Sequence, residues 1–286
     1  MARDIPLATY RLQLTKDFGF DAAVELVPHL RALGISHLYA SPFLKARAGS
    51  VHGYDIVDHN QLNPEFGGEE AFARLSQALD AAGMGLILDF VPNHMGVGRD
   101  DNAWWLDVLE WGRKSPFAAS FDIAWETLPY KPEGGILLPI LGRPYGDSLE
   151  AGEITLRYNA EEGSFSAWYF GHRLPIRPSR YGEIIRTVVA AAGAAEAPAG
   201  RRLLEIAKLH PHPGAPSREE APAFKAALAA VEDGAKIIGR GLRAYRPSPD
   251  EPAAVLALHR LLERQHYRVA HWQVAGSEIN YRRFFD

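Results

Sequence analysis

The chain has 286 residues, a formal net charge of -4 and no cysteine. The lack of cysteine excludes disulfides, thiolate metal sites and a catalytic thiol. The weakly acidic balance provides no basic field for nucleic acid and no polybasic surface for a membrane, and no apolar run is long enough to span a bilayer. We therefore expect a soluble, cytoplasmic protein with a sizeable core.

The first part of the chain alternates between strand and helix patterns. Residues 8–14 alternate β-favouring and polar side chains, which predicts a strand. Apolar residues along one helical face predict a helix over residues 21–33, and residues 35–40 predict a second strand. A polar loop over residues 41–68 then leads to a second helix over residues 72–82. This alternation is typical of a parallel sheet covered by helices.

The segment over residues 86–94, Leu-Ile-Leu-Asp-Phe-Val-Pro-Asn-His, is the most informative in the chain. Its aliphatic start predicts a parallel strand that is buried on both faces. Asp89, Asn93 and His94 follow at the strand end and in the first turn beyond it. In a barrel of parallel strands, polar groups at this end usually form the active site. The alternative interpretation is a core strand that runs into a polar turn.

The strand and helix alternation stops after residue 95. We interpret residues 96–250 as an insertion after the third strand, because short aromatic-rich segments here are separated by proline and glycine. Within it we expect a hairpin over residues 155–170 and a helix over residues 224–238. Apolar residues from Val255 to Trp272 predict a long amphipathic helix.

Two motifs resemble the α-amylase superfamily of retaining glycosidases and transglycosidases. They are His-Gly-Tyr-Asp at residues 52–55 and Asp-Phe-Val-Pro-Asn-His at residues 89–94. Three further segments, residues 41–47, 138–142 and 280–285, resemble the maltooligosyl trehalose synthases, a family within glycoside hydrolase family 13. This resemblance runs along essentially the whole chain.

The resemblance implies a TIM-type (β/α)8 barrel in the α/β class, of which only the first three to four strands are present. Residues 1–95 would form strands one to three. Residues 96–250 would form a domain inserted after strand three. Residues 251–286 would return to the barrel with its third helix and the start of the strand-four region.

The resemblance also implies a reaction. These enzymes convert the reducing-end α-1,4 bond of a maltodextrin into an α,α-1,1 bond, which makes them isomerases of trehalose biosynthesis. A retaining mechanism requires two carboxyl groups about 5 Å apart. None of the acidic residues here matches the family's catalytic motifs. We therefore expect an N-terminal portion that is inactive alone, with the catalytic groups C-terminal to Asp286, no cofactor and no metal.

The resemblance assigns maltooligosaccharide-binding roles to His52, Tyr54, Asp55, Asp89, Asn93 and His94. Trp105 is a seventh candidate, because an aromatic face suits the apolar face of a glucose ring. Tyr54 would stack under the sugar beside the scissile bond, Asp89 would support the site, and His94 would donate to the 6-hydroxyl of that sugar. For Trp105 the alternative is packing, because tryptophans at near-helical spacing usually pack.

Two alternatives to the synthase remain. The chain could belong to an α-glucan hydrolase or glucanotransferase of the same superfamily, or it could be a non-catalytic glucan-binding protein. For a synthase, a functional partnership with a maltooligosyl trehalose trehalohydrolase is expected. We also expect the side chains of Tyr10, Leu12 and Leu86, or of their neighbours, to face the barrel interior and to lack an opposite wall. The isolated chain would then be insoluble, partly molten or dependent on a partner chain that supplies the other strands.

Overall fold

The computed structural model describes residues 5–128, 134–209, 215–247 and 251–282. The chain divides into two compact units. Residues 1–97 and 101–103 form the N-terminal unit, and residues 98–100 and 104–286 form the C-terminal unit. Within the described ranges, no helix combines the length and the apolar character that crossing a membrane requires.

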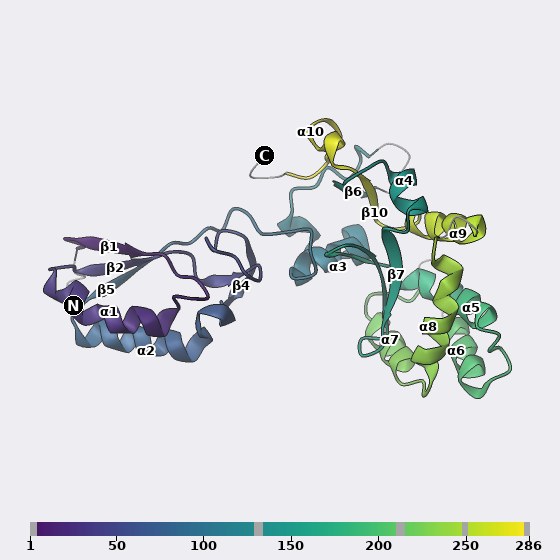
Figure 1. The fold of residues 1–286 in the computed structure, drawn as a ribbon, viewed down its shortest axis with the longest axis horizontal. Coiled ribbons are helices and arrows are strands. Elements are labelled where there is room, and N and C mark those ends of the chain that lie inside the picture. The colour runs from purple at the N-terminus through teal and green to yellow at the C-terminus, as the bar shows by residue number, and fades with distance from the viewer. Residues whose placement is uncertain (1–4, 129–133, 210–214, 248–250, 283–286) are drawn as a thin grey trace. The chain divides into compact units, whose positions relative to one another are not determined.

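The N-terminal unit is built on a parallel sheet in the order β1-β2-β5. Its strands are β1 (Thr9–Leu12), β2 (His37–Ala40) and β5 (Gly85–Leu88). Helices α1 (Phe20–Ala32) and α2 (Gly68–Ala81) follow β1 and precede β5, and Figure 1 shows both on the same face of the sheet. The predicted alternation of strands and helices is confirmed.

The core of this unit lies between the sheet and the two helices. Alternate residues of β2, Leu38 and Ala40, are buried there, while His37 and Tyr39 point to the other face, as the two-residue period of a strand requires. The core includes Leu12, Phe20, Leu30, Leu38, Ala40, Leu75 and Leu79.

The prediction for the face of Tyr10, Leu12 and Leu86 is wrong. Leu12 is part of the core that the helices cover, and Leu86 packs against it. Tyr10 shares a register row with Leu38 and Leu86, so it lies on this same face. The opposite face carries a mainly polar set instead: Thr9, Arg11, His37 and Tyr39, with Ile87 among them.

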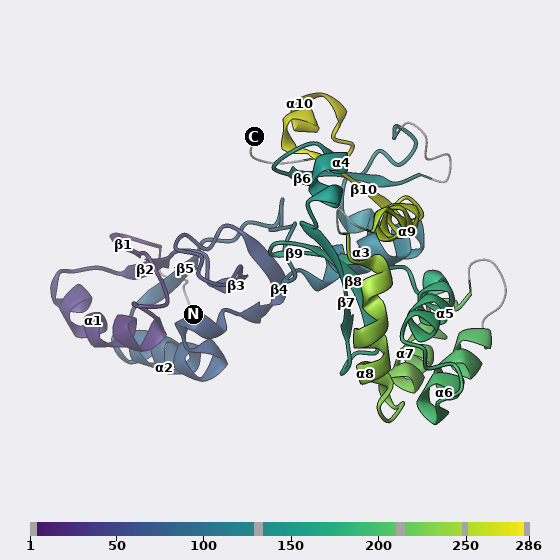
Figure 2. The same ribbon diagram turned by 45° about the vertical axis from the view of Figure 1, so that its right-hand side comes forward.

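The stretch that we predicted as a polar loop contains two strands and a short turn of helix. Strands β3 (Leu44–Ala46) and β4 (Ile56–Leu62), labelled in Figure 2, pair antiparallel. Their register is irregular, and a 3-10 turn follows at Pro64–Phe66. Only the first two residues of β4 are buried. A strand with so short an apolar stretch has little signal in the sequence.

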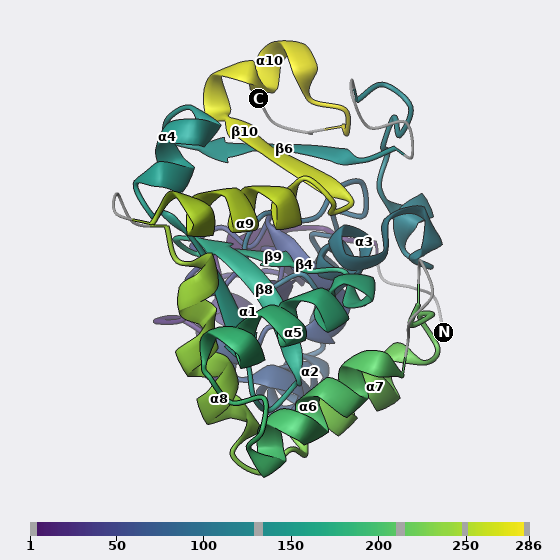
Figure 3. The same ribbon diagram turned by 90° about the vertical axis from the view of Figure 1, so that its right-hand side faces the viewer.

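The C-terminal unit contains an antiparallel sheet. Strands β7 (Ile154–Asn159), β8 (Ser164–Tyr169) and β9 (His172–Pro175) pair in that order, which confirms the predicted hairpin. Four helices follow in sequence and are visible in Figure 3: α5 (Tyr181–Ala191), α6 (Pro198–Lys208), α7 (Ala221–Ala229) and α8 (Gly234–Gly241). The single helix predicted over residues 224–238 is therefore two helices, because the backbone turns at Asp233, whose φ is +58°.

A second sheet in this unit pairs strands that are distant in sequence. Strand β6 (Ile136–Leu141) runs parallel to β10 (Tyr267–His271), and Figure 3 shows them side by side. The prediction of one long helix from Val255 to Trp272 is wrong. Helix α9 (Pro252–Leu262) ends at Leu262, and the chain then forms β10, where Tyr267 and Val269 are buried at alternate positions.

The remaining elements are short. They are the helices α3 (Ala103–Trp111), α4 (Tyr145–Glu150) and α10 (Ala275–Glu278). Further 3-10 turns lie at Gly112–Lys114, Ala118–Ser120, Pro178–Arg180, Leu242–Tyr245 and Trp272–Val274. Helix α9 and strand β10 lie within the C-terminal unit, and the expected return of residues 251–286 to a barrel stays a prediction.

Candidate functional site

A cluster of polar side chains surrounds Asp89, directly after β5. The Asp89 amide donates to the carbonyl of Ala40 at the end of β2 (3.2 Å), which holds the residue at the carboxyl edge of the sheet. One carboxylate oxygen of Asp89, Oδ2, accepts from the hydroxyl of Tyr54 (2.6 Å) and from the hydroxyl of Tyr39 (3.1 Å). The Arg11 guanidinium lies 4.0 Å from the same oxygen. With its side chain only 12% exposed, Asp89 is thus surrounded by donors.

The hydrogen bond to Asp89 also affects the titration of Tyr54. This hydrogen bond, followed by partial burial, raises the pKa of the Tyr54 hydroxyl above its usual value. The hydroxyl is a donor to Asp89. Because an acceptor fixes its far end, the Tyr54 ring is held in one orientation, which suits a platform for a flat apolar ligand face.

Arg11 and Tyr39 are site residues that the sequence analysis missed. They occupy equivalent positions on neighbouring strands, and the Arg11 guanidinium lies 5.6 Å from the centroid of the Tyr39 ring. Both belong to the polar face of the sheet. The signal that could have identified them is a polar or aromatic residue at the strand position one step before the carboxyl end.

A tight turn carries Tyr54 to this position. Gly53 has a φ of +78°, and a Cβ at this residue would lie 2.4 Å from the carbonyl oxygen of Pro42. Neither the backbone conformation nor the space admits a side chain. This explains the glycine immediately before Tyr54.

Side chains of the turn bond to one another and fix its shape. The Ser50 hydroxyl donates to the carboxylate of Asp55 and accepts from the Gly53 amide (3.1 Å). The Tyr54 amide donates to Nδ1 of His52 (3.0 Å), and the His52 ring stacks near the Tyr54 ring with centroids 6.1 Å apart. His52, Tyr54 and Asp55 therefore form one structural unit, in which Asp55 supports the turn.

His94, which follows β5 in the chain, contacts the turn that carries Tyr54. Its Nε2 lies 2.9 Å from the carbonyl oxygen of Tyr54, and its Nδ1 lies 3.1 Å from Oδ1 of Asn93. Both partners are oxygens, which accept, so each nitrogen donates to its partner only when it carries a proton. One ring nitrogen of His94 thus faces the main chain, and the other faces the exposed Asn93.

Trp105 belongs to the C-terminal unit, in α3, and is only 1% exposed. Its ring packs against Phe121 and Tyr281, with centroid distances of 5.0 Å and 5.2 Å. A ring buried in this way presents no face to a ligand. The burial favours the packing alternative for this residue.

The described residues contain no group of three histidine, aspartate or glutamate side chains that could hold a metal ion. Both carboxylates of the site accept hydrogen bonds from neutral hydroxyl groups, Asp55 from a serine and Asp89 from two tyrosines. This chemistry suits the positioning of neighbouring groups more than nucleophilic attack. The arrangement can orient an aromatic platform and offer polar edges around it.

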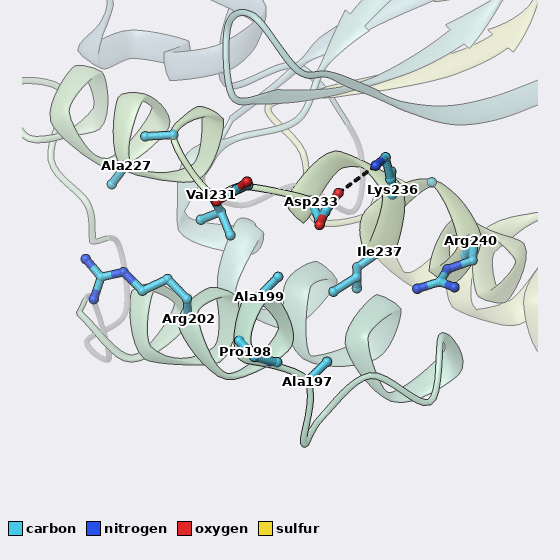
Figure 4. Close-up of a pocket in the computed structure, with 13 residues that line it drawn as sticks. Ala197, Pro198, Ala199, Arg202, Ala227, Val231, Asp233, Lys236, Ile237 and Arg240 are labelled. Atoms are coloured by element: carbon cyan, nitrogen blue, oxygen red, sulfur yellow. Dashed lines mark hydrogen bonds and ion pairs between the residues drawn. The ribbon is translucent and has the colours of Figure 1, made fainter.

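The C-terminal unit has a groove of about 1170 Å³ between α6, α7 and α8, shown in Figure 4. Its lining is largely apolar, with Ala197, Pro198 and Ile237 among the lining residues. Asp233 and Lys236 form an ion pair at its edge (2.6 Å). None of the predicted site residues lines this groove.

The sequence and the fold of this chain are similar to those of α-amylase-type proteins. Residues 21–118 match the alpha-amylase family, described as alpha amylase, catalytic domain. Over 164 residues the chain is 46% identical to a putative maltooligosyl trehalose synthase of Mycobacterium tuberculosis (strain ATCC 25618 / H37Rv), a match that covers 52% of this chain and 21% of that protein. The structure of maltooligosyltrehalose synthase from Arthrobacter ramosus aligns with 98% of this chain and 26% of its own, with a TM-score of 0.61 and 31% identity.

The chain resembles the maltooligosyl trehalose synthases in sequence and in fold. It spans about a fifth to a quarter of the length of these relatives, as the covered shares of 21% and 26% show. It is also 34% identical over 108 residues to the intracellular maltogenic amylase of Bacillus subtilis (strain 168), over 37% of this chain and 18% of that protein.

Proposed function

We propose that this chain forms part of the glucan-binding site of a maltooligosyl trehalose synthase. The observation that carries the proposal is the 2.6 Å hydrogen bond that holds the Tyr54 hydroxyl on Asp89 at the strand ends. It fixes an aromatic ring in the place where the resemblance implies a sugar-stacking platform. The 46% identity to a putative synthase supports the same assignment.

In the proposed reaction, the enzyme cleaves the reducing-end α-1,4 bond of a maltodextrin with retention through a covalent glucosyl intermediate. The released glucose stays bound, turns and attacks through its anomeric hydroxyl, which yields the α,α-1,1 bond. Water must be excluded in this interval, because hydrolysis would otherwise compete.

The residues of this chain bind and orient the sugar. The Tyr54 ring packs against the apolar face of a glucose unit, and His52, Asn93 and His94 offer polar atoms at its edge. Asp89 acts through Tyr54, as a positioning residue. The nucleophile and the acid/base are assigned to a part of the enzyme outside this sequence, so the chain alone is inactive.

The same proposal includes the wider architecture. The sheet β1-β2-β5 contributes the first three of the strands of a (β/α)8 barrel, residues 96–250 are a domain inserted after strand three, and residues 251–286 return to the barrel. The enzyme acts in the cytoplasm on maltooligosaccharides, in partnership with a maltooligosyl trehalose trehalohydrolase. The parallel order of the three strands supports the barrel assignment.

A chimera tests the function. Residues of this chain replace the matching 164 residues of the M. tuberculosis relative, and the purified chimera is incubated with maltopentaose. A loss of reducing ends supports the synthase. A gain of reducing ends supports the second candidate, a hydrolase, which the 34% identity to a maltogenic amylase favours. A folded chimera that binds maltopentaose and leaves the reducing ends unchanged would support a glucan-binding protein instead.

A second experiment measures glucan binding by this chain alone. We expect it to bind maltopentaose, to lose this binding with Tyr54→Ala, and to leave the reducing ends unchanged. Phe90→Ala is the matched control, because Phe90 is 57% exposed near the same strand end and is not assigned to the site. Equal binding by all three proteins would contradict the role of Tyr54.

A further inference from the structure

A second cavity of about 570 Å³ lies within the C-terminal unit, between β7 and the end of α8 with the 3-10 turn that follows it. Four arginines line it, Arg157 from β7 and three from the helical side: Arg240, Arg243 and Arg246. Among the residues that the structure describes, the lining contains no aspartate or glutamate. In a chain whose formal net charge is -4, this is an unusual concentration of positive charge.

Two of these guanidinium groups are held in place by neighbours. Arg157 donates from Nε to the Thr155 hydroxyl (3.3 Å), and its guanidinium carbon lies 5.0 Å from the centroid of the Trp168 ring. Arg243 donates from one terminal nitrogen to the carbonyl of Ala191. These contacts orient the groups, and they leave their charges uncompensated because all the partners are neutral.

Some arginines elsewhere in the same unit have carboxylate partners. Arg218 pairs with Asp107 at 3.0 Å, and Arg143 pairs with Glu153 at 2.9 Å. Over the residues that the structure describes, none of the four cavity arginines forms an ion pair. All four arginine side chains are exposed, and arginine keeps its charge at any ordinary pH, so the cavity offers four charged donors to an anion from solution.

The rest of the lining suits an organic molecule with an attached anionic group. Leu156, Leu242 and the rings of Tyr158 and Tyr245 provide apolar surface beside the arginines. Burial raises the pKa of Tyr158 to about 12, so its hydroxyl is protonated at neutral pH. The volume lies within the range of small-molecule sites, roughly 300–1,000 Å³.

We propose that this cavity binds a small phosphate ester, such as a phosphorylated sugar or a nucleotide. The planar guanidinium fork matches the geometry of phosphate oxygens, and a phosphate group carries up to two charges where a carboxylate carries one. Several arginines without internal partners therefore fit a phosphate better than a carboxylate. This site is independent of the glucan-binding site proposed above.

Isothermal titration calorimetry on the full chain tests the proposal, with pyrophosphate and glucose 6-phosphate as probes. We expect saturable binding, and we expect Arg240→Gln and Arg246→Gln each to raise the dissociation constant for pyrophosphate about tenfold, the cost of one charged hydrogen bond. Arg201→Gln is the matched control, since Arg201 is an exposed arginine on α6 that does not line the cavity. All three variants remove an exposed charge and should keep the circular dichroism spectrum of the parent.

The two probes separate the sources of the anion. Tighter binding of glucose 6-phosphate than of pyrophosphate would support a sugar phosphate, and the reverse order would support a nucleotide polyphosphate. Equal weakening by Arg240→Gln and Arg201→Gln would overturn the proposal, because the binding would then follow overall charge. No saturable binding of either probe, or binding of a short RNA without binding of pyrophosphate, would also overturn it.

Discussion

The turn that carries Tyr54 should tolerate no side chain at Gly53, and Gly49 provides a matched comparison. Both glycines have positive φ, +78° and +74°. Alanine at either position would destabilise the fold by about 1–2 kcal/mol, because its side chain disfavours the left-handed backbone conformation. A Cβ at Gly53 would also lie 2.4 Å from the Pro42 carbonyl oxygen, whereas nothing lies within 4 Å of one at Gly49. Overpacking of this kind costs roughly a further 1–3 kcal/mol.

We therefore expect Gly53→Ala to lower the free energy of unfolding of the N-terminal unit by about 2–5 kcal/mol, and Gly49→Ala by about 1–2 kcal/mol. All six tryptophans of the chain follow residue 103, so they belong to the C-terminal unit. In urea titrations, tryptophan fluorescence then reports the C-terminal unit, and hydrogen exchange of α1 and α2 reports the N-terminal unit. Only the second signal should change, and Gly53→Ala should also weaken maltopentaose binding. Equal destabilisation by the two variants would refute the close contact with Pro42.

Three further predictions concern single side chains. Tyr54→Phe should destabilise the N-terminal unit by about 1–3 kcal/mol at pH 7, because Asp89 loses a donor. Since the folded pKa of Tyr54 is raised, this contribution is complete below the unfolded pKa of about 10 and is lost as the pH rises through the folded value; a difference that persisted in strong alkali would contradict the hydrogen bond. His94→Ala should speed amide exchange in the turn and, in the chimera, reduce turnover more than it raises KM; an effect on KM alone would exclude a role at the reacting centre. Glu162→Gln should destabilise the C-terminal unit at pH 7 and less at pH 3, because the hydrogen bond from Arg173 holds the pKa of Glu162 below its usual value, so this contribution is lost as the pH falls through the folded pKa; urea titrations at both pH values measure the difference.

The elements that the sequence predicted well are those whose signal is local. Strands β1 and β2 and helices α1 and α2 each show the period of their own conformation, because one face of each packs on the same core. Strand β10 shows the limit of this reasoning. Val269 continues the apolar spacing of α9, and the choice of a strand depends on pairing with β6, more than 120 residues earlier in the chain. A pairing partner at that distance leaves no periodic signal.

The same distinction applies to the candidate site. Tyr54, Asp89 and His94 were predicted from motifs, and the structure brings them together through hydrogen bonds. Arg11 and Tyr39 were missed: their position near the strand ends was a signal, but their approach to Asp89 depends on the register between three strands. Trp105 was predicted as a binding residue, but its ring is buried. A tryptophan on a helix has the same sequence signal whether it packs in a core or faces a ligand.

The predicted poor solubility of the isolated chain leads to a test at β5. Among the described residues of the N-terminal unit, this strand pairs only with β2, so its other edge offers unpaired N–H and C=O groups to another chain. Leu88, at the end of β5, is 55% exposed and makes this edge apolar. Leu88→Lys should therefore reduce association in light scattering across a range of protein concentrations, because a charge on an edge strand opposes pairing.

The stability cost of Leu88→Lys should be small. More than half of the Leu88 side chain is already in water, so the lost burial is worth about 1 kcal/mol or less. Leu256→Lys is the matched control. Leu256 is 44% exposed on α9, where the helix satisfies its own backbone groups, so the same substitution removes apolar surface and leaves the strand edge unchanged. An equal reduction of association by both variants would show that exposed apolar area drives it, and the open edge of β5 would then not be its cause.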